Sequence, residues 1–168
     1  MDRYTEQILT KKPDMKQKLL IIGAVLITAM GVAFICFVHF SAGVAIATVG
    51  GFLIYWTRLC SNSEYEYLFI NGDLDIARIT NKSTRKDIYS FKDGDVQRVL
   101  PYNSDAFSNE LQVNAELTVK NFTSGDLDNQ DSWYVFMTNA KNGTHGVVLE
   151  LNEKSLAHVK ECFKNKMN

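Results

Sequence analysis

The sequence predicts a membrane α-helical hairpin joined to a mainly-β soluble domain. Two apolar runs, residues 19–39 and 43–59, stand near the start of the 168-residue chain, and their only Lys, Arg, Asp or Glu is Arg58. After the second run, apolar and polar residues alternate with a period of two, as in half-buried strands. The chain then ends in an amphipathic stretch with helical spacing.

Each apolar run is long enough to cross a bilayer, whose core of about 30 Å needs about 17 to 25 residues of helix. Only Phe40, Ser41 and Ala42 separate the runs, so the two spans form a tight hairpin. A buried hairpin in a soluble core is one alternative, but it would show a polar face. A signal peptide cleaved near Ala45-Ile46-Ala47 is another, but its apolar region would be shorter and no second run would follow.

The hairpin divides the chain into three parts: an N-terminal segment (1–18), the transmembrane hairpin (19–59) and a domain (60–168) of a size that suits one folding unit. In the N-terminal segment, Tyr4 and Ile8 share one helical face. The segment could therefore form a short interfacial helix on the membrane, or it could be an ordinary frayed terminus.

Basic residues flank the hairpin at its two open ends. Lys11, Lys12, Lys16 and Lys18 precede the first span, Arg58 closes the second, and the turn carries no charge. Because basic flanking residues stay in the cytoplasm, we expect a multi-pass cell-membrane protein with both termini cytoplasmic. Three Asn-x-Ser/Thr sequons, typical of secreted domains, favour the opposite orientation; they begin at Asn81, Asn121 and Asn142.

The second span carries small residues every four positions, at Gly43, Ala47 and Gly51. Such a face lets two helices approach closely, and the short turn favours packing within the hairpin. The same face could instead support a homo-oligomer. A matching face in the first span would comprise Ala24, Thr28 and Gly31.

The pattern of apolar and polar residues in the domain predicts seven strands followed by one helix. The dipeptides Asn71-Gly72 and Asn142-Gly143 are strong hairpin signals. In the C-terminal stretch, Leu156, Val159, Phe163 and Met167 recur at helical spacing, after an N-cap at Asn152 or Ser155. The predicted strands cover residues 64–70, 74–80, 86–91, 95–100, 112–120, 133–138 and 145–151.

This order of elements resembles the pleckstrin-homology-like (PH-like) fold, in which two bent antiparallel sheets pack together and a C-terminal helix closes one end. The blocks Tyr4-Thr5-Glu6-Gln7-Ile8 and Asn71-Gly72-Asp73-Leu74-Asp75-Ile76, with two spans between them, are also similar to a family of uncharacterised two-span membrane proteins from clostridia and related Gram-positive bacteria. That resemblance implies a topology and a compartment, and no activity.

The sequence shows no catalytic constellation of nucleophile, base and orienting group, so we expect a protein that is not an enzyme and uses no cofactor. His39, His145 and His158 have no sequence neighbours that suggest a triad. An acidic loop with Asp126, Asp128 and Asp131 resembles a calcium loop. It lacks the glycine and the bidentate glutamate of that pattern, so we expect a solvated loop and no metal.

Eukaryotic relatives of the PH-like fold bind phosphoinositides with basic residues around the first hairpin. Here the turn Asn71-Gly72-Asp73 is acidic, which argues against a headgroup site there. One basic cluster, Lys82, Arg85 and Lys86, is a candidate contact for anionic lipid, although a solvated turn would also explain it.

We therefore expect an integral membrane protein that presents a PH-like binding or scaffolding domain at the cytoplasmic face. The expected partners are the lipid bilayer and a membrane or cytoplasmic protein. Residues 60–168 carry 12 Lys and Arg against 16 Asp and Glu, which disfavours nucleic acid as a partner. The alternatives are an accessory subunit of a transporter or envelope enzyme, which would use the spans as its interface, and a cryptic hydrolase.

Overall fold

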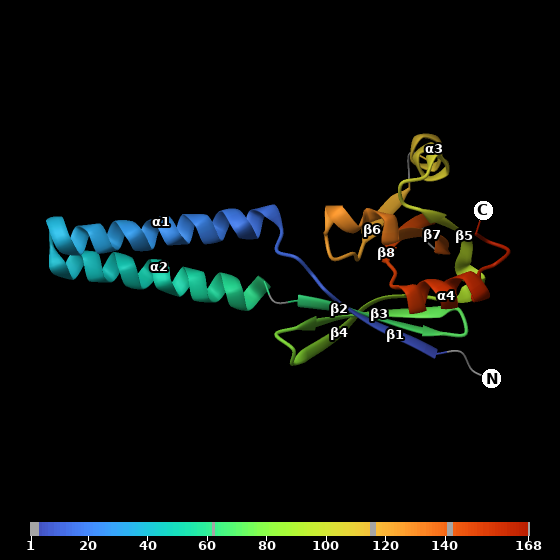
Figure 1. Ribbon diagram of the computed structural model, residues 1–168, viewed down its shortest axis with the longest axis horizontal. Helices are drawn as coiled ribbons and strands as arrows, with labels where there is room; N and C mark the ends of the chain where they lie inside the picture. The colour runs from blue at the N-terminus through green and yellow to red at the C-terminus, as the bar shows by residue number, and fades with distance from the viewer. Residues whose placement is uncertain (1–3, 62, 115–116, 141–142, 168) are drawn as a thin grey trace.

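The computed structural model describes residues 4–61, 63–114, 117–140 and 143–167. Two long antiparallel helices extend from one end of a domain built from two four-stranded sheets (Figure 1). The helices are α1 (Met15–Phe37) and α2 (Phe40–Ser61). Asp14 caps α1, since its carboxylate accepts the Met15 amide at 2.8 Å and its own amide donates to Gln17 Oε1 at 3.1 Å. Both helices are long and apolar enough to cross a membrane.

The N-terminal segment contains a strand, so neither alternative considered from the sequence, an interfacial helix or a frayed terminus, is correct for residues 4–10. Residues Tyr4–Thr10 form β1, which pairs antiparallel with β2 (Ser63–Ile70) along its whole length. The spacing of Tyr4 and Ile8 fits a helix, but it also fits alternate positions of a strand. Gln7 points inward and is 6% exposed, whereas Ile8 points outward and is 55% exposed. The helical hairpin is therefore inserted between the first two strands of one sheet.

The first sheet has the order β1-β2-β3-β4, with β3 at Asp73–Thr80 and β4 at Thr84–Phe91. The hairpin predicted at Asn71-Gly72 is present, with φ values of +53° and +94° that suit this dipeptide. A register shift between Ile76 and Ala77 places a bulge in the pairing of β3 with β4. A bulge increases the local twist and interrupts the hydrogen-bond ladder, so the edge of the first sheet at β4 is irregular.

The second sheet has the order β5-β7-β8-β6, in which β6 runs parallel to β8. Its strands are β5 (Val96–Pro101), β6 (Thr118–Asn121), β7 (Trp133–Ala140) and β8 (Gly143–Glu150). The predicted turn residue Asn142 lies outside the described residues. Short 3₁₀ turns, η1 (Asp93–Asp95) and η2 (Leu127–Ser132), precede β5 and β7.

The predicted strand at residues 112–120 is wrong over its first part. Helix α3 (Asp105–Val113) occupies the preceding segment, and only Thr118–Asn121 is a strand. Ser104 caps α3 by accepting the Phe107 amide at 3.3 Å, and Phe107 is buried beside Tyr102. This cap and this aromatic contact outweigh the alternation of Val113 with its neighbours, and Val113 itself is 80% exposed. The described residues thus form eight strands, of which β1 and the parallel β6 were not predicted as such.

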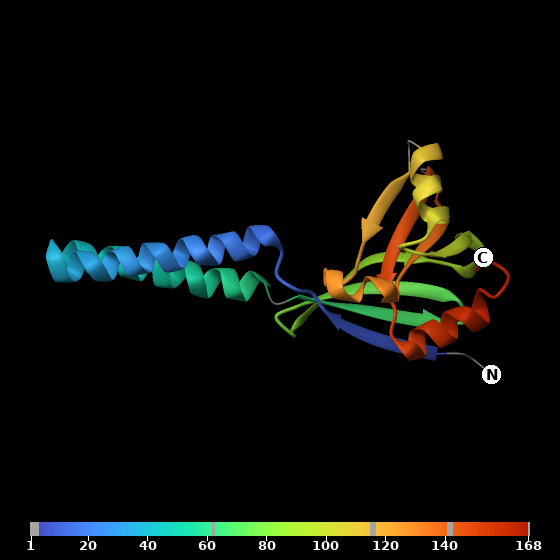
Figure 2. The same cartoon turned by 45° about the horizontal axis from the view of Figure 1, so that its top comes forward.

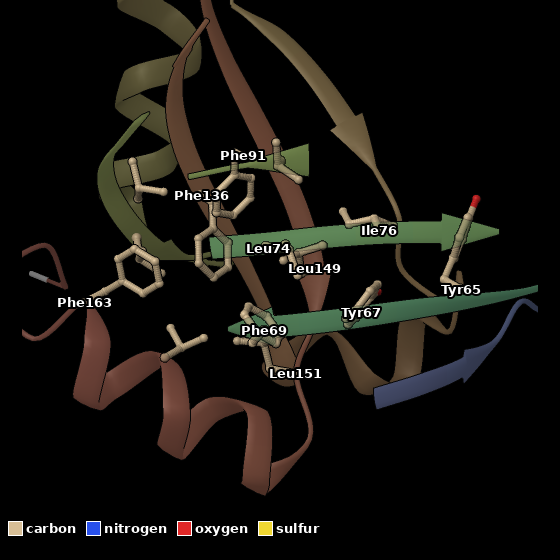
Figure 3. Packing of buried hydrophobic residues seen from close by; sticks show 14 residues of the cluster. Tyr65, Tyr67, Phe69, Leu74, Ile76, Phe91, Phe136, Leu149, Leu151 and Phe163 are labelled. Carbon is tan, nitrogen blue, oxygen red and sulfur yellow. The ribbon is translucent and has the colours of Figure 1, made fainter. Parts of the chain in front are cut away.

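The C-terminal helix α4 (Glu153–Cys162) closes the domain at the end far from the hairpin (Figures 1 and 2). Asn152 is its N-cap and accepts the Ser155 amide at 2.8 Å, as predicted. Val159 and Phe163 are fully buried, and Phe163 packs edge-on against Phe136 at 5.7 Å between ring centroids (Figure 3). The main core therefore lies between the two sheets and under α4.

Candidate functional site

The hairpin is joined to the domain by residues 11–14, which we call the joint. The Lys11 amide donates to the Ser63 carbonyl at 3.0 Å, and the Lys12 amide donates to the Ser124 carbonyl at 2.8 Å. Lys12 Nζ also pairs with Asp126 Oδ2 at 2.5 Å. This hydrogen bond lowers the pKa of Asp126. The joint is thus bound to β2 on one side and to a loop of the second sheet on the other.

That loop, residues 121–129, is held in place by a buried carboxylate. Glu150 is 6% exposed and accepts the amide and the hydroxyl of Ser124 at 3.0 and 2.5 Å. Its other oxygen accepts Asn129 Nδ2 at 3.1 Å. Because three donors converge on one buried acceptor, the loop has a defined geometry although it contains no long regular element.

A cleft of about 510 Å³ opens between the joint, the start of α1 and the loop 121–129. Three lysines and one carboxylate, Asp14, line it, so its lining is basic. The side chains of Met15 and Leu127 at the cleft are 76% and 72% exposed. The complete lining is Lys11, Lys12, Pro13, Asp14, Met15, Lys18, Asn121, Thr123, Ser124, Gly125 and Leu127.

Three cations lie over aromatic rings at the hairpin end of the core. Lys11 and Arg78 each lie 5.9 Å from the ring centroid of Tyr65, and Lys120 lies 4.4 Å from that of Tyr89. Figure 3 shows Tyr65 at one end of the row of core residues on β2. Burial of Tyr67, whose hydroxyl donates to the Phe122 carbonyl at 2.7 Å, raises the pKa of that phenol. This end of the core therefore combines aromatic rings with cations.

In the predicted basic cluster of Lys82, Arg85 and Lys86, strand alternation separates Arg85 from Lys86. Arg85 pairs with Glu66 at 2.5 Å and with Asp87 at 3.2 Å on the outer face of the first sheet, and the bond to Glu66 raises the pKa of Arg85. Lys86 is its neighbour on β4 and so points to the other face. Lys82 lies in the β3–β4 turn with a φ of +56°. This turn lies on the hairpin side of the domain (Figures 1 and 2).

The small residues of α2 divide between two environments. A Cβ added to Gly43 would lie 2.7 Å from the Gly31 carbonyl oxygen and would also meet the Ile35 backbone. Ala47 faces Gly31, whose added Cβ would lie 2.8 Å from the Ala47 Cα. Gly51, however, has open space around it, and its predicted place in the interface is taken by Gly50, which lies against Thr28. The contact positions are therefore Gly43, Ala47 and Gly50, four and then three residues apart, because an α-helix has 3.6 residues per turn.

A second groove, of about 590 Å³, lies beside β4 on the outer face of the first sheet, where Leu68, Asp75 and Ser90 are cross-strand neighbours. Its lining mixes both charges with apolar side chains, and no strand pairs with the outer edge of β4 among the described residues. The lining consists of Leu68, Asp75, Arg85, Asp87, Ile88, Tyr89 and Ser90.

Two of the three histidines and one carboxylate of the acidic loop have polar neighbours within hydrogen-bond distance. His39 lies 3.0 Å from the Ser41 hydroxyl at the hairpin turn, and His158 lies 3.2 Å from the Thr5 hydroxyl beneath β1. Asp126 is engaged by Lys12 and by the Asp128 amide. Within the described ranges, no three His, Cys, Asp or Glu side chains gather as metal ligands.

The family model described as "Bacterial PH-like domain (DUF6106)" matches residues 1–168. The chain belongs to this family. No curated protein and no solved structure matches it. The family assignment and the strand order together make β1 the first strand of the PH-like domain. Its first connection is then the helical hairpin, and Asn71-Gly72-Asp73 is the second connection, which corrects the expectation that this turn is the first hairpin.

Proposed function

We propose that this chain is an integral membrane protein that holds its PH-like domain at the cytoplasmic face as a binding module for a protein partner. The observation that carries the proposal is the insertion of the apolar hairpin between β1 and β2. Both helices are strongly apolar, and only 11% of the apolar stretch of each is buried inside the protein. Such an apolar surface is stable in lipid and unstable in water.

Insertion within the fold supports a fixed orientation of the domain. Two chain segments leave the hairpin, and each enters a neighbouring strand of the same sheet. The joint adds hydrogen bonds to Ser63 and Ser124. A domain on one flexible linker would sample many orientations, whereas two short connections with backbone bonds restrict it. The four lysines before the first span and Arg58 after the second support a cytoplasmic location.

The groove beside β4 is the surface that we propose for the protein partner. An unpaired strand edge offers backbone donors and acceptors to an added strand, and Leu68 and Ile88 provide apolar contacts. Arg85 and Asp87 place both charges at the same groove, which favours a partner of mixed charge over nucleic acid. The proposed role is binding, without catalysis.

Site-specific cross-linking in cells tests this proposal. A photoreactive amino acid at Ser90, in the groove, should yield one discrete cross-linked protein. The same amino acid at Lys154, which is exposed on α4, is the matched control and should not yield that product. No specific product at Ser90, or the same product at both positions, would contradict a binding role for the groove.

Exchange of the spans distinguishes the accessory-subunit alternative. A chain whose residues 19–59 are replaced by an unrelated two-span hairpin should keep the Ser90 cross-link if the spans serve only as an anchor. Loss of the cross-link with correct membrane insertion would instead favour the spans as the interface.

A further inference from the structure

The joint cleft differs from the groove beside β4 in charge and in position. Three of its lining residues are lysines, Lys11, Lys12 and Lys18, from the segment that enters α1. Its acidic groups are already engaged, since Asp14 caps α1 and the nearby Asp126 pairs with Lys12. The cleft is therefore left with a positive charge, carried by Lys11 and Lys18 in particular.

The position of the cleft along α1 sets its depth if the hairpin spans a bilayer. The apolar run begins at Leu19, one residue after Lys18 and less than two turns after the helix starts at Met15. A helix rises about 1.5 Å per residue. The headgroup layers add about 5 to 7 Å to each side of the hydrocarbon core. The cleft then lies at the depth of the lipid phosphates.

Leu127 supplies a second and independent indication of a lipid surface. It stands in the polar stretch Gly125-Asp126-Leu127-Asp128, yet its side chain is 72% exposed. Met15 across the cleft is 76% exposed. The η2 turn that Leu127 begins, the orange coil nearest the helices in Figures 1 and 2, lies on the hairpin side of the domain. An exposed apolar side chain beside lysines is typical of a surface that contacts the headgroup and acyl boundary.

We propose that the joint cleft binds the phosphate of an anionic phospholipid from the leaflet on the same side of the membrane as the PH-like domain. Lys11 and Lys18 contact the phosphate as point charges, and Leu127 lies at the acyl boundary. The Glu150 contacts fix the loop that forms the far wall. The site rests on the proposed membrane insertion and differs from the sequence-predicted candidate at Lys82, Arg85 and Lys86.

Lipid binding to the full chain can be measured by native mass spectrometry from detergent, with phosphatidylglycerol and phosphatidylcholine as the two probes. The wild-type chain should prefer phosphatidylglycerol. In the variant Lys11→Gln/Lys18→Gln, the ratio of the affinities for phosphatidylglycerol and phosphatidylcholine should fall by about fivefold for each lysine removed. Lys12 and Lys16 stay in this variant, so it keeps the Lys12 contact to Asp126 and, with Arg58, three of the five basic residues that flank the spans. The matched control, Lys154→Gln/Lys160→Gln on α4, should keep the preference.

Two further measurements test the contact of Leu127 with lipid and the source of the phosphate. Leu127→Ser should weaken binding of phosphatidylglycerol without unfolding the domain, because this side chain is exposed. Glycerol phosphate in excess should fail to displace the lipid; full displacement would show a site for free phosphate and overturn the lipid as its source. Equal binding of both lipids by the wild type, or unchanged preference in the double lysine variant, would also overturn the proposal.

Membrane extraction separates this proposal from the proposed function. A chain that is released from membranes by alkaline carbonate contradicts the membrane anchor itself. A chain that stays in the membrane with cytoplasmic ends but shows no lipid preference contradicts only the cleft.

Discussion

The buried carboxylate of Glu150 accepts both the amide and the hydroxyl of Ser124, at 3.0 and 2.5 Å, across 26 residues of sequence. The carbonyl oxygen of Glu150 also accepts Gln7 Nε2 at 2.8 Å. One residue at the end of β8 therefore connects the first strand of the chain with the loop that binds the joint. The orientation of the hairpin relative to the domain depends on this connection.

Glu150→Gln should destabilise the domain by about 2 kcal/mol, because charge-assisted bonds to the three donors become weaker and the amide nitrogen that replaces one oxygen faces a donor that it cannot accept. The midpoint of thermal unfolding, followed through tryptophan fluorescence with its buried reporter Trp133, measures this loss. Asp131→Asn removes an exposed carboxylate from the same region and should leave the midpoint unchanged. Equal midpoints for Glu150→Gln and the wild type would show that the loop is held by other contacts.

Gln7→Ala should cost about 1 to 3 kcal/mol, since it removes the bond to the Glu150 carbonyl and leaves the Asn152 amide without its 3.0 Å acceptor. Ile8→Ala is the matched control on the opposite face of β1 and should cost much less, because Ile8 is 55% exposed. Thermal unfolding of the two variants checks the strand directly. An interfacial helix would give the reverse order, with Ile8 the more sensitive position.

The segments that the sequence predicts well are those whose structure is decided by near neighbours. The apolar runs, the Asn71-Gly72 turn and α4 with its Asn152 cap depend on residues within one or two turns. The strand β1 does not, because its seven residues fit either period and only pairing with β2, beyond the hairpin, decides between them. Likewise, α3 depends on burial of Phe107 in the second core cluster, whose members Trp133, Val135 and Val148 come from strands later in the chain.

The joint cleft could be predicted only in part from the sequence, for the same reason. Lys11, Lys12 and Lys18 stand out in the sequence, but by themselves they indicate only topology. Their partner surface, the loop 121–129, reaches them through the Lys12 bond to Ser124, more than one hundred residues away. Arg85 shows the opposite case, since it is adjacent to Lys86 in sequence, but strand alternation separates their side chains and Arg85 pairs with Glu66.

Gly43→Ile should disrupt the helical hairpin, because a side chain there meets the backbone of Gly31 and Ile35. Overpacking of this kind costs about 1 to 3 kcal/mol. Gly51→Ile adds the same side chain to open space and is the matched control. Loss of helical circular dichroism during titration with sodium dodecyl sulfate measures the difference. If both variants unfold at the same detergent fraction, the two helices do not pack as described.

The Lys12–Asp126 pair should make the stability of the joint depend on pH. The lowered pKa of Asp126 means that this carboxylate favours folding above its unfolded value of 3.8, and that the contribution is lost as pH falls through the folded pKa. Asp126→Asn should therefore unfold at a slightly lower temperature than the wild type at neutral pH, and the difference should vanish in acid. A difference that grows in acid would contradict the pairing.

Topology can be tested with reporters fused at two positions. The lysines before α1 and Arg58 at the end of α2 favour both termini inside, and the turn between the spans has no competing charge. A reporter active only in the cytoplasm should therefore be active after Asn168, and one active only outside should be active when inserted at Ser41. Neutral residues in place of Lys11, Lys12, Lys16 and Lys18 should weaken this preference. An external C-terminal reporter in the native sequence would instead make the sequons at Asn81 and Asn121 available for glycosylation and place the domain, with both of its proposed binding surfaces, outside the cytoplasm.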